Sequence, residues 1–201
     1  MRLFVTMRLG VISESSLSKT MSISSLKSVR LRTHVLPRLG YFPNSEFHQL
    51  PLLIYQNVLS FSETSDAGSF VEELFRKNGF LPQWRYGMYK QSHYHSNTHE
   101  VLGVICGGAL LRFGGEDKGV VEERVHTGDV LVIPVGVGHR AVEEDGNFQM
   151  VGAYAKDSPS WDMNYGSNQQ EYDQATLNIH KVPLPKSDPV YGKGPLLKLW
   201  T

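Results

Sequence analysis

The 201-residue sequence contains a single cysteine, Cys106, and no apolar run that approaches the roughly 20 residues needed to span a membrane. One cysteine excludes an intrachain disulfide framework and is typical of a reducing compartment. We therefore expect a soluble, cytoplasmic protein without a membrane partner. Hydrophobic residues make up 40% of the chain and charged residues 20%, which excludes a disordered or fibrous protein.

Acidic residues are almost missing from the first 44 residues, which hold seven Lys or Arg side chains and one acid, Glu14. Since the whole chain has 20 charged residues of each sign, residues 45–201 carry 13 basic and 19 acidic side chains. An acidic body without a basic stripe argues against a nucleic-acid partner. We interpret residues 1–44 as a basic, Ser-rich extension that is partly disordered or a targeting segment, with the mitochondrion as the alternative location. Alternating polar and apolar residues at 28–35 predict an edge strand inside this extension.

Residues 45–201 are interpreted as one domain. Between residues 80 and 154, no helical run of the length found in βαβ units interrupts the chain, which argues against a doubly wound parallel sheet. Short apolar runs alternate there with Gly- and Asp-rich turns, and this spacing predicts an all-β antiparallel sandwich or barrel. The runs lie at 101–105, 109–113, 130–133 and 148–154.

One short helix is predicted to flank this sheet structure. Ser65 or Asp66 can cap its N-terminus, and Gly79 stands where a helix ends. Its apolar face, which is expected to pack on the outside of a sheet, carries Phe70, Leu74 and Phe75.

The chain from about residue 158 onward is rich in Pro, Asn and Gln and shows weak periodicity. Prolines at 183, 185 and 189 exclude a regular strand or helix around them, so we expect an extended C-terminal arm. Its apolar end, residues 195–200, is expected to be buried on the barrel or on a second subunit. The apolar arms at both ends indicate a homodimer, although the same arms can close over their own barrel.

Four side chains indicate a metal site. His93 and His95 are two residues apart, so on an extended strand both imidazoles point to the same face, and a divalent metal supplies the polar partner that each buried imidazole needs. Glu100 adds an anionic ligand, and His139 can complete the set. Three neutral imidazoles and a carboxylate suit Fe(II), Mn, Ni, Cu or Zn and leave one or two positions open.

Other side chains are candidates for a supporting role. Tyr89 and Gln91 share strand parity with His93 and His95 and are predicted to line the cavity and bind substrate. Trp84 and Arg85 can form one wall of its mouth. Glu143 and Arg140 are weaker candidates for a general acid or base, His99 is expected in a second layer or at the surface, and His126 is expected to be exposed.

The order and spacing of these residues resemble the two motifs of the cupin superfamily. The first consists of Gly87, His93, His95, Glu100 and Gly107, and the second of Gly128, Pro134, Gly136 and His139. The resemblance implies a double-stranded β-helix, or jelly-roll, barrel with a metal held inside by His93, His95, Glu100 and His139. Glu143 occupies a position where many cupins have Asn, which puts in doubt only a hydrogen bond from that Asn.

A narrower resemblance, to an uncharacterised single-domain cupin family, rests on residues 82–85, 93–103, 128–139 and 188–200. It covers roughly residues 35–201 and implies no particular substrate. We expect a metalloenzyme with dioxygenase-like or related redox or isomerase chemistry on a small organic molecule. The alternative is a non-catalytic cupin that binds a metal or a small ligand. A metal-free sugar-epimerase type fits poorly, since such a site does not need four aligned ligands.

Overall fold

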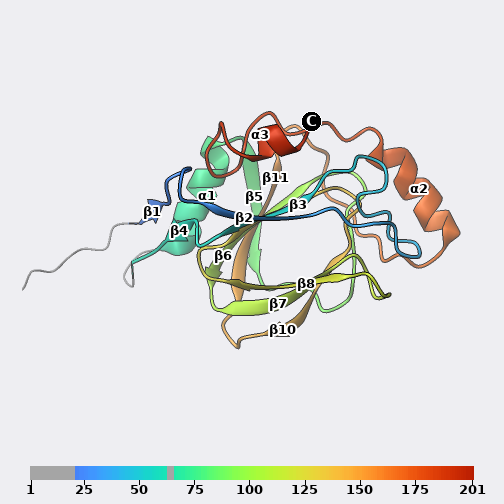
Figure 1. The fold of residues 1–201 in the computed structure, drawn as a ribbon, viewed down its shortest axis with the longest axis horizontal. Coiled ribbons are helices and arrows are strands. Elements are labelled where there is room, and N and C mark those ends of the chain that lie inside the picture. Colours follow the sequence, from blue (N-terminus) through green and yellow to red (C-terminus); the bar gives the residue numbers. More distant parts are fainter. Residues whose placement is uncertain (1–20, 63–65) are drawn as a thin grey trace, which may run out of the picture.

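The computed structural model describes residues 21–62 and 66–201, and these ranges form a β-rich domain with three helices on its outside (Figure 1). The elements are, in chain order, β1 Ser22–Ile23, β2 Arg30–His34, β3 Leu52–Gln56, β4 Leu59–Ser60, α1 Ala67–Lys77, β5 Phe80–Tyr86, β6 Glu100–Cys106, β7 Gly108–Phe113, β8 Val121–His126, β9 Val130–Ile133, β10 His139–Glu144, β11 Gln149–Ala155, α2 Gln169–Ile179 and α3 Leu196–Leu199.

Two antiparallel sheets face each other and form the predicted jelly-roll barrel. The larger sheet has the order β2-β3-β9-β6-β11-β5, and the smaller has the order β10-β7-β8. Figure 1 shows β7, β8 and β10 at the bottom of the molecule, away from α3. The four apolar runs singled out in the sequence form β6, β7, β9 and β11, which confirms the all-β prediction.

Strands β3, β9, β6 and β11 of the larger sheet are buried on both faces, which explains why they read as continuous apolar runs. In β6, Leu102 and Val104 point into the barrel, whereas Val101 belongs to a second core between the sheet and the helices. Glu100 has the same parity as Leu102 and therefore also faces the barrel interior. Strand alternation thus places one carboxylate inside an otherwise apolar wall.

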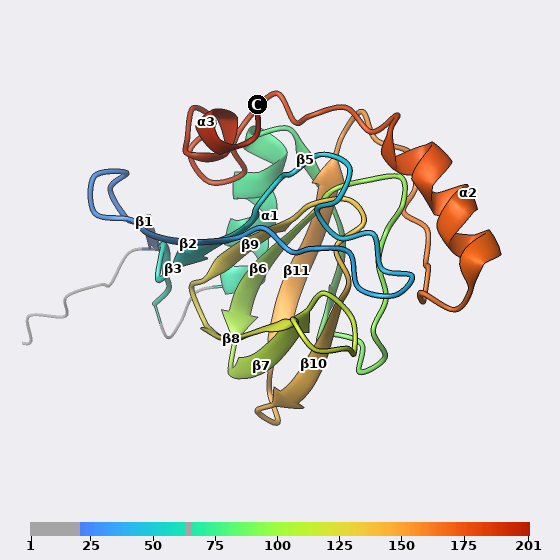
Figure 2. The ribbon, with the colours of Figure 1, turned by 45° about the vertical axis from the view of Figure 1, so that its right-hand side comes forward.

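Helix α1 covers the outer face of the larger sheet, as predicted (Figure 2). Asp66 caps it by accepting a hydrogen bond from the backbone N–H of Ser69 at 3.0 Å; Ser65, the other candidate, lies outside the described residues. A Cβ atom on Gly103 of β6 would lie 2.6 Å from Val71, so a glycine is needed for the close approach of helix and strand.

The C-terminal arm differs from the sequence prediction because it contains a regular helix, α2. Asn168 caps this helix, and its buried residues Tyr172, Ala175 and Ile179 form a narrow stripe in an otherwise polar segment. Such a stripe leaves only a weak periodic signal in the sequence, which is why an extended arm was predicted. Figure 2 shows α2 at the right-hand end of the molecule, away from α1.

The end of the arm packs on its own chain. Leu196 of α3 and Trp200 are buried in the core between the larger sheet and α1, so the apolar C-terminal residues close over their own barrel. Strand β2 pairs with β3 and confirms the strand predicted within the N-terminal stretch. The remainder of that prediction, a targeting or disordered segment, falls largely on residues 1–20, outside the described ranges. No helix within 21–62 or 66–201 is long and apolar enough to cross a membrane.

Candidate metal centre

Three elements bring the four predicted ligands to one end of the barrel. His93 and His95 lie on an extended segment that follows β5, Glu100 opens β6 and His139 opens β10. His93 forms a β-bridge with His139, with backbone hydrogen bonds in both directions at 3.2 and 2.8 Å. Residues 46 positions apart in the chain are therefore held together by the backbone.

The imidazoles of His93, His95 and His139 converge inside the barrel. One nitrogen of each lies within 4.8 Å of one nitrogen of the other two. The side chains are almost fully buried, with exposed fractions of 3%, 5% and 1%, and Glu100 is 3% exposed. The structure thus brings together the four residues that the sequence singled out, and the three buried histidines can bind a metal.

Backbone carbonyl groups orient all three rings. The Nδ1 atom of His93 lies 3.0 Å from the carbonyl oxygen of Gln91, and that of His139 lies 3.0 Å from the carbonyl oxygen of Val137. The Nδ1 atom of His95 bonds the carbonyl oxygen of Asp162. A carbonyl oxygen only accepts hydrogen bonds, so each Nδ1 carries the proton and each neutral ring keeps a free electron pair on Nε2. This tautomer is the one that a histidine needs to bind a metal through Nε2.

Glu100 completes the group and has its own support. Its Oε1 atom lies 3.3 Å from Nε2 of His95, and its Oε2 atom lies 3.1 Å from Nε2 of His139. The hydroxyl of Tyr154 donates a 2.7 Å hydrogen bond to Oε1, and the indole N–H of Trp84 donates a 3.1 Å hydrogen bond to the Tyr154 oxygen. Strand pairing places Tyr154 of β11 opposite Glu100 of β6.

The electrostatics of the site favour neutral His93 and ionised Glu100. Burial, reinforced by the neighbouring His139, lowers the pKa of His93 to about 3. Burial alone would raise the pKa of Glu100, but His95 and His139 hold it well below its usual range. Burial likewise opposes a charge on His95, but the Glu100 carboxylate outweighs it and raises the pKa of His95.

The donor set fits a metal ion. Two donors at right angles around one ion, each about 2.1 Å from it, lie about 3 Å apart, close to the distances between Glu100 and the histidine nitrogens. Among the described residues, Oε2 of Glu100 and Nε2 of His139 have no hydrogen-bond partner although both are buried. Buried polar atoms without partners are unfavourable, and a shared cation satisfies both.

A cavity of about 290 Å³ opens above this group. Tyr89 lines it as predicted, and Trp84 and Arg85 contribute to the same wall. The side chain of Gln91 is not part of the lining: it is exposed and borders a different surface depression. The chain bends at residues 90–91, so strand parity does not extend back from His93, and Gln91 contributes its carbonyl oxygen instead of its side chain.

The remaining candidates lie away from the cavity. His99 is buried rather than exposed: its Nδ1 accepts a 3.0 Å hydrogen bond from the backbone N–H of Val135, and its ring packs on Trp200. Arg140 points away from His139 and pairs with Glu116 at 2.7 Å. Glu143 is exposed and pairs with Arg124, and His126 is exposed as expected.

Three residues of the site were not predicted from the sequence: Tyr154, Trp161 and Asp162. Tyr154 ends an apolar run and shares strand parity with Met150, which was a usable signal for an inward direction. Trp161 and Asp162 lie in a segment without regular structure, so neither helical nor strand periodicity could assign their directions.

Comparison with known proteins identifies the family of the chain. The family model described as Cupin matches residues 85–159, which include all four residues of the site. The uncharacterized protein YjlB of Bacillus subtilis (strain 168) is 35% identical over 170 residues, which cover 84% of this chain and 96% of YjlB.

Two solved structures match part of this chain. The vicilin of Solanum lycopersicum (tomato) matches 68% of this chain and 29% of its own, with 15% identity and a TM-score of 0.33. A Bacillus subtilis oxalate decarboxylase, described with Mn(II) centers, matches 65% of this chain and 28% of its own, with 20% identity and a TM-score of 0.31. The chain therefore spans less than a third of either solved chain. The similarity to YjlB over nearly its full length, together with the family model, shows that this protein belongs to the cupin family.

Proposed function

We propose that this cupin holds one divalent transition metal ion, Fe, Mn, Ni, Cu or Zn, through His93, His95, Glu100 and His139, and that it acts on a small organic molecule. The observation that carries the proposal is the common direction of the free Nε2 electron pairs, fixed by a carbonyl oxygen behind each ring. Such carbonyl partners are typical of metal-ligating histidines.

Four protein donors leave one or two positions of a five- or six-coordinate ion for a ligand. A bound metal would supply Lewis-acid or redox chemistry at these positions. The chain's own contribution is positional: the barrel walls bury the four donors, the carbonyl groups hold the rings, and Tyr154 holds Glu100.

We propose dioxygenase-like or related redox or isomerase chemistry for the bound molecule. The cavity supports this reading, because it reaches the proposed ligands from the outside and has room for a small molecule next to them. A non-catalytic metal- or ligand-binding role is the alternative. Conversion of a bound compound, followed by mass spectrometry with and without added metal, distinguishes the two.

Elemental analysis tests the metal site. Protein expressed with iron, manganese, nickel and zinc all available is expected to carry close to one metal ion per chain. His95→Ala should lose stoichiometric metal, whereas His126→Ala, which changes an exposed histidine outside the cavity, should retain it. Equal loss in both variants, or no metal in the wild type, would refute the proposed ligand set.

Two further parts of the proposal concern the environment of the protein. A homodimer remains proposed, but because the apolar end of the C-terminal arm is buried on its own chain, a dimer would have to use other surfaces. Light scattering coupled to size-exclusion chromatography measures this. A cytoplasmic location, with the mitochondrion as the alternative, is tested by cell fractionation.

A further inference from the structure

We infer that the ligand of this cavity is a planar aromatic molecule that carries a single anionic oxygen group. The anionic oxygen group is inferred from the proposed metal function, on which this part of the inference rests. The aromatic ring is inferred from the residues of the cavity walls. The walls contain two indoles and three phenols, from Trp84, Trp161, Tyr86, Tyr89 and Tyr154.

Aromatic rings stand directly against the histidines. The ring of Trp161 lies 5.7 Å from that of His95, and it stacks on Tyr154 at 6.3 Å with an angle of 25°. On the other side of the histidine pair, Tyr89 meets His93 edge-on at 5.4 Å. A molecule that reaches the proposed metal ligands is therefore bordered by aromatic faces and edges, which favour a flat ring over a saturated one of the same size.

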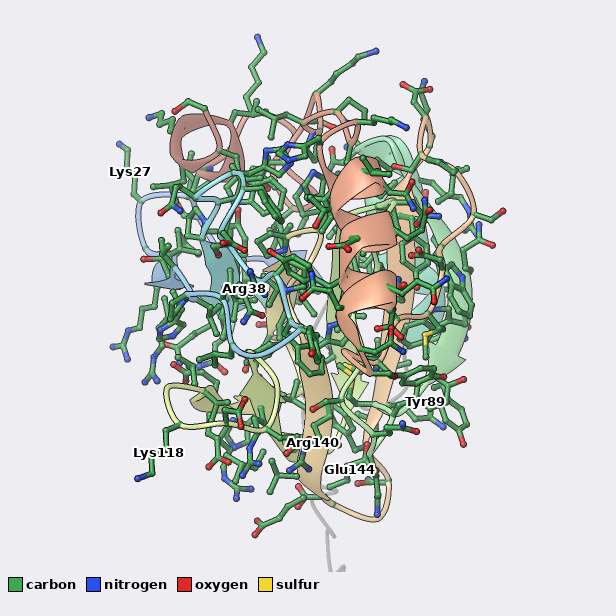
Figure 3. All side chains as sticks on the ribbon, turned by 90° about the vertical axis from the view of Figure 1, so that its right-hand side faces the viewer. Lys27, Arg38, Tyr89, Lys118, Arg140 and Glu144 are labelled. Carbon is green, nitrogen blue, oxygen red and sulfur yellow. The ribbon has the colours of Figure 1, made fainter. Side chains whose placement is uncertain are left out.

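The mouth of the cavity exposes these rings to solvent. Tyr86 is 65% exposed, Tyr89 54% and Trp161 38%, and all three border the one cavity above the histidines. Figure 3 shows Tyr89 at the outer edge of the molecule. Large aromatic side chains gathered around the mouth of a pocket leave apolar surface in water, and a bound aromatic molecule would cover part of it.

The size of the cavity restricts the ligand to a small molecule. A cavity of about 150 Å³ accommodates benzene, so about 290 Å³ accommodates one substituted ring or a fused pair of rings. Met88 and Met163 complete the walls, and their flexible thioethers adapt to the edge of a ring and contact aromatic faces favourably.

The charges of the lining restrict the ligand to one anionic group. Arg85 is the one Lys or Arg among the lining residues that the structure describes, and its guanidinium is turned toward α1, where it pairs with Glu72 at 2.7 Å and Asp66 at 3.4 Å. A divalent ion with three neutral imidazoles and the Glu100 carboxylate has a net charge of +1. One anionic oxygen neutralises that charge, and a second would lie among aromatic walls without a cationic partner.

Three carboxylates with matched groups test the inference. Benzoate and cyclohexanecarboxylate offer the same carboxylate on a flat and on a saturated ring, and terephthalate adds a second carboxylate at the far end of the flat ring. Binding to the full-length protein is followed by NMR titration of the tryptophan indole N–H signals. Those of Trp84 and Trp161 lie at the cavity, whereas Trp200 packs on His99 away from it.

Benzoate is expected to bind about tenfold more tightly than either cyclohexanecarboxylate or terephthalate. Its binding should shift the indole N–H signals of Trp84 and Trp161 and leave the signal of Trp200 unchanged. Trp161→Leu should remove the preference for the flat ring and leave the metal content unchanged. Tyr165→Leu is the matched control, since Tyr165 is 40% exposed but does not line this cavity. It should keep the preference.

Equal affinities for benzoate and cyclohexanecarboxylate, or no indole shift with either compound up to the solubility limit, would overturn the inference. Tighter binding of terephthalate than of benzoate would overturn the inference that the ligand carries a single anionic group. The titration is repeated on chelator-treated protein, in which the walls alone should still favour benzoate. Elemental analysis of the same samples shows separately whether the proposed metal function fails.

Discussion

The hydroxyl of Tyr154 donates a hydrogen bond to Oε1 of Glu100, so the two oxygens of this carboxylate have different roles. Oε1 is held by the phenol, whereas Oε2 lies 3.1 Å from Nε2 of His139 and has no hydrogen-bond partner within the described residues. The indole N–H of Trp84 in turn donates a hydrogen bond to the Tyr154 oxygen. Hydrogen bonds therefore connect Trp84 in the cavity wall, through Tyr154, to the proposed metal ligand Glu100.

Tyr154→Phe is expected to weaken metal binding about tenfold, because partners of this kind orient a ligating group and their loss typically costs 10- to 100-fold. Competition with a chromophoric chelator measures the affinity. The matched control is Tyr94→Phe, which removes the hydroxyl of a fully buried tyrosine that makes no hydrogen bond in the described part of the chain. If both variants lose the same affinity, Tyr154 does not act through Glu100.

Gly152→Ala is expected to displace the Trp84 indole. A Cβ atom at this position of β11 would lie 2.0 Å from Trp84 Cε2, and the body of a ring cannot move aside as a flexible chain end can. We expect a loss of about 1–3 kcal/mol in the free energy of unfolding and a changed tryptophan fluorescence spectrum. Denaturant titration measures the free energy of unfolding. Gly146→Ala is the control and should have nearly the wild-type value, since a Cβ there meets nothing within 4 Å. Equal effects of the two substitutions would contradict this account.

Asp188→Ala is expected to loosen the C-terminal arm and lower the free energy of unfolding by about 4 kcal/mol. The Asp188 carboxylate is fully buried and accepts hydrogen bonds from the Tyr55 hydroxyl at 2.5 Å and from three backbone N–H groups of the arm. Denaturant unfolding and limited proteolysis of the arm measure the effect. Asp157→Ala, which removes a 3.5 Å surface pair with Lys186, should change stability by less than about 1 kcal/mol. A small effect at Asp188 would show that the arm is held by apolar packing alone.

Acid is expected to destabilise the metal-free protein through His99. Burial, assisted by the nearby His48, lowers the pKa of His99 from 6.5 to about 3. Between these values the unfolded chain binds a proton at His99 and the folded protein does not, so the free energy of unfolding falls as the pH is lowered through this window. His93 contributes in the same direction.

Denaturant titrations at a series of pH values, with a chelator present, measure this slope. His99→Gln should reduce it by about 1.4 kcal/mol per pH unit, whereas His126→Gln is expected to follow the wild-type curve. A slope that is unchanged in His99→Gln would show that His99 becomes protonated in the folded protein.

The strands and three of the proposed ligands, His93, His95 and Glu100, could be predicted from the sequence because they depend on short-range spacing. The apolar runs of β6 and β9 and the separation of His93 from His95 are local properties of an extended chain. The position of His139 was accessible through the turn that precedes it and through the family motif. The direction of its Nε2 was not, since it depends on the carbonyl oxygen of Val137.

Other parts of the site depend on irregular backbone or on pairing between distant strands. Gln91 was misplaced because the chain bends beside it. The role of Tyr154 follows from its register opposite Glu100, which no local pattern reveals. Helix α2 was missed because its buried stripe has only three residues. Of these three, the role of Tyr154 is the one decided by a pairing between segments that are far apart in the chain.

The segment after β11 links the walls of the cavity to the histidines. Trp161 and Met163 border the cavity, while Asp162 between them bonds His95 through its carbonyl oxygen and accepts hydrogen bonds from the backbone N–H and hydroxyl of Ser96 through its carboxylate. Residues that line the proposed ligand cavity and a residue that orients an imidazole are thus covalent neighbours. Evolution toward a different ligand by insertion or deletion in this segment would therefore also alter the reactivity of the centre, so specificity and chemistry would change together.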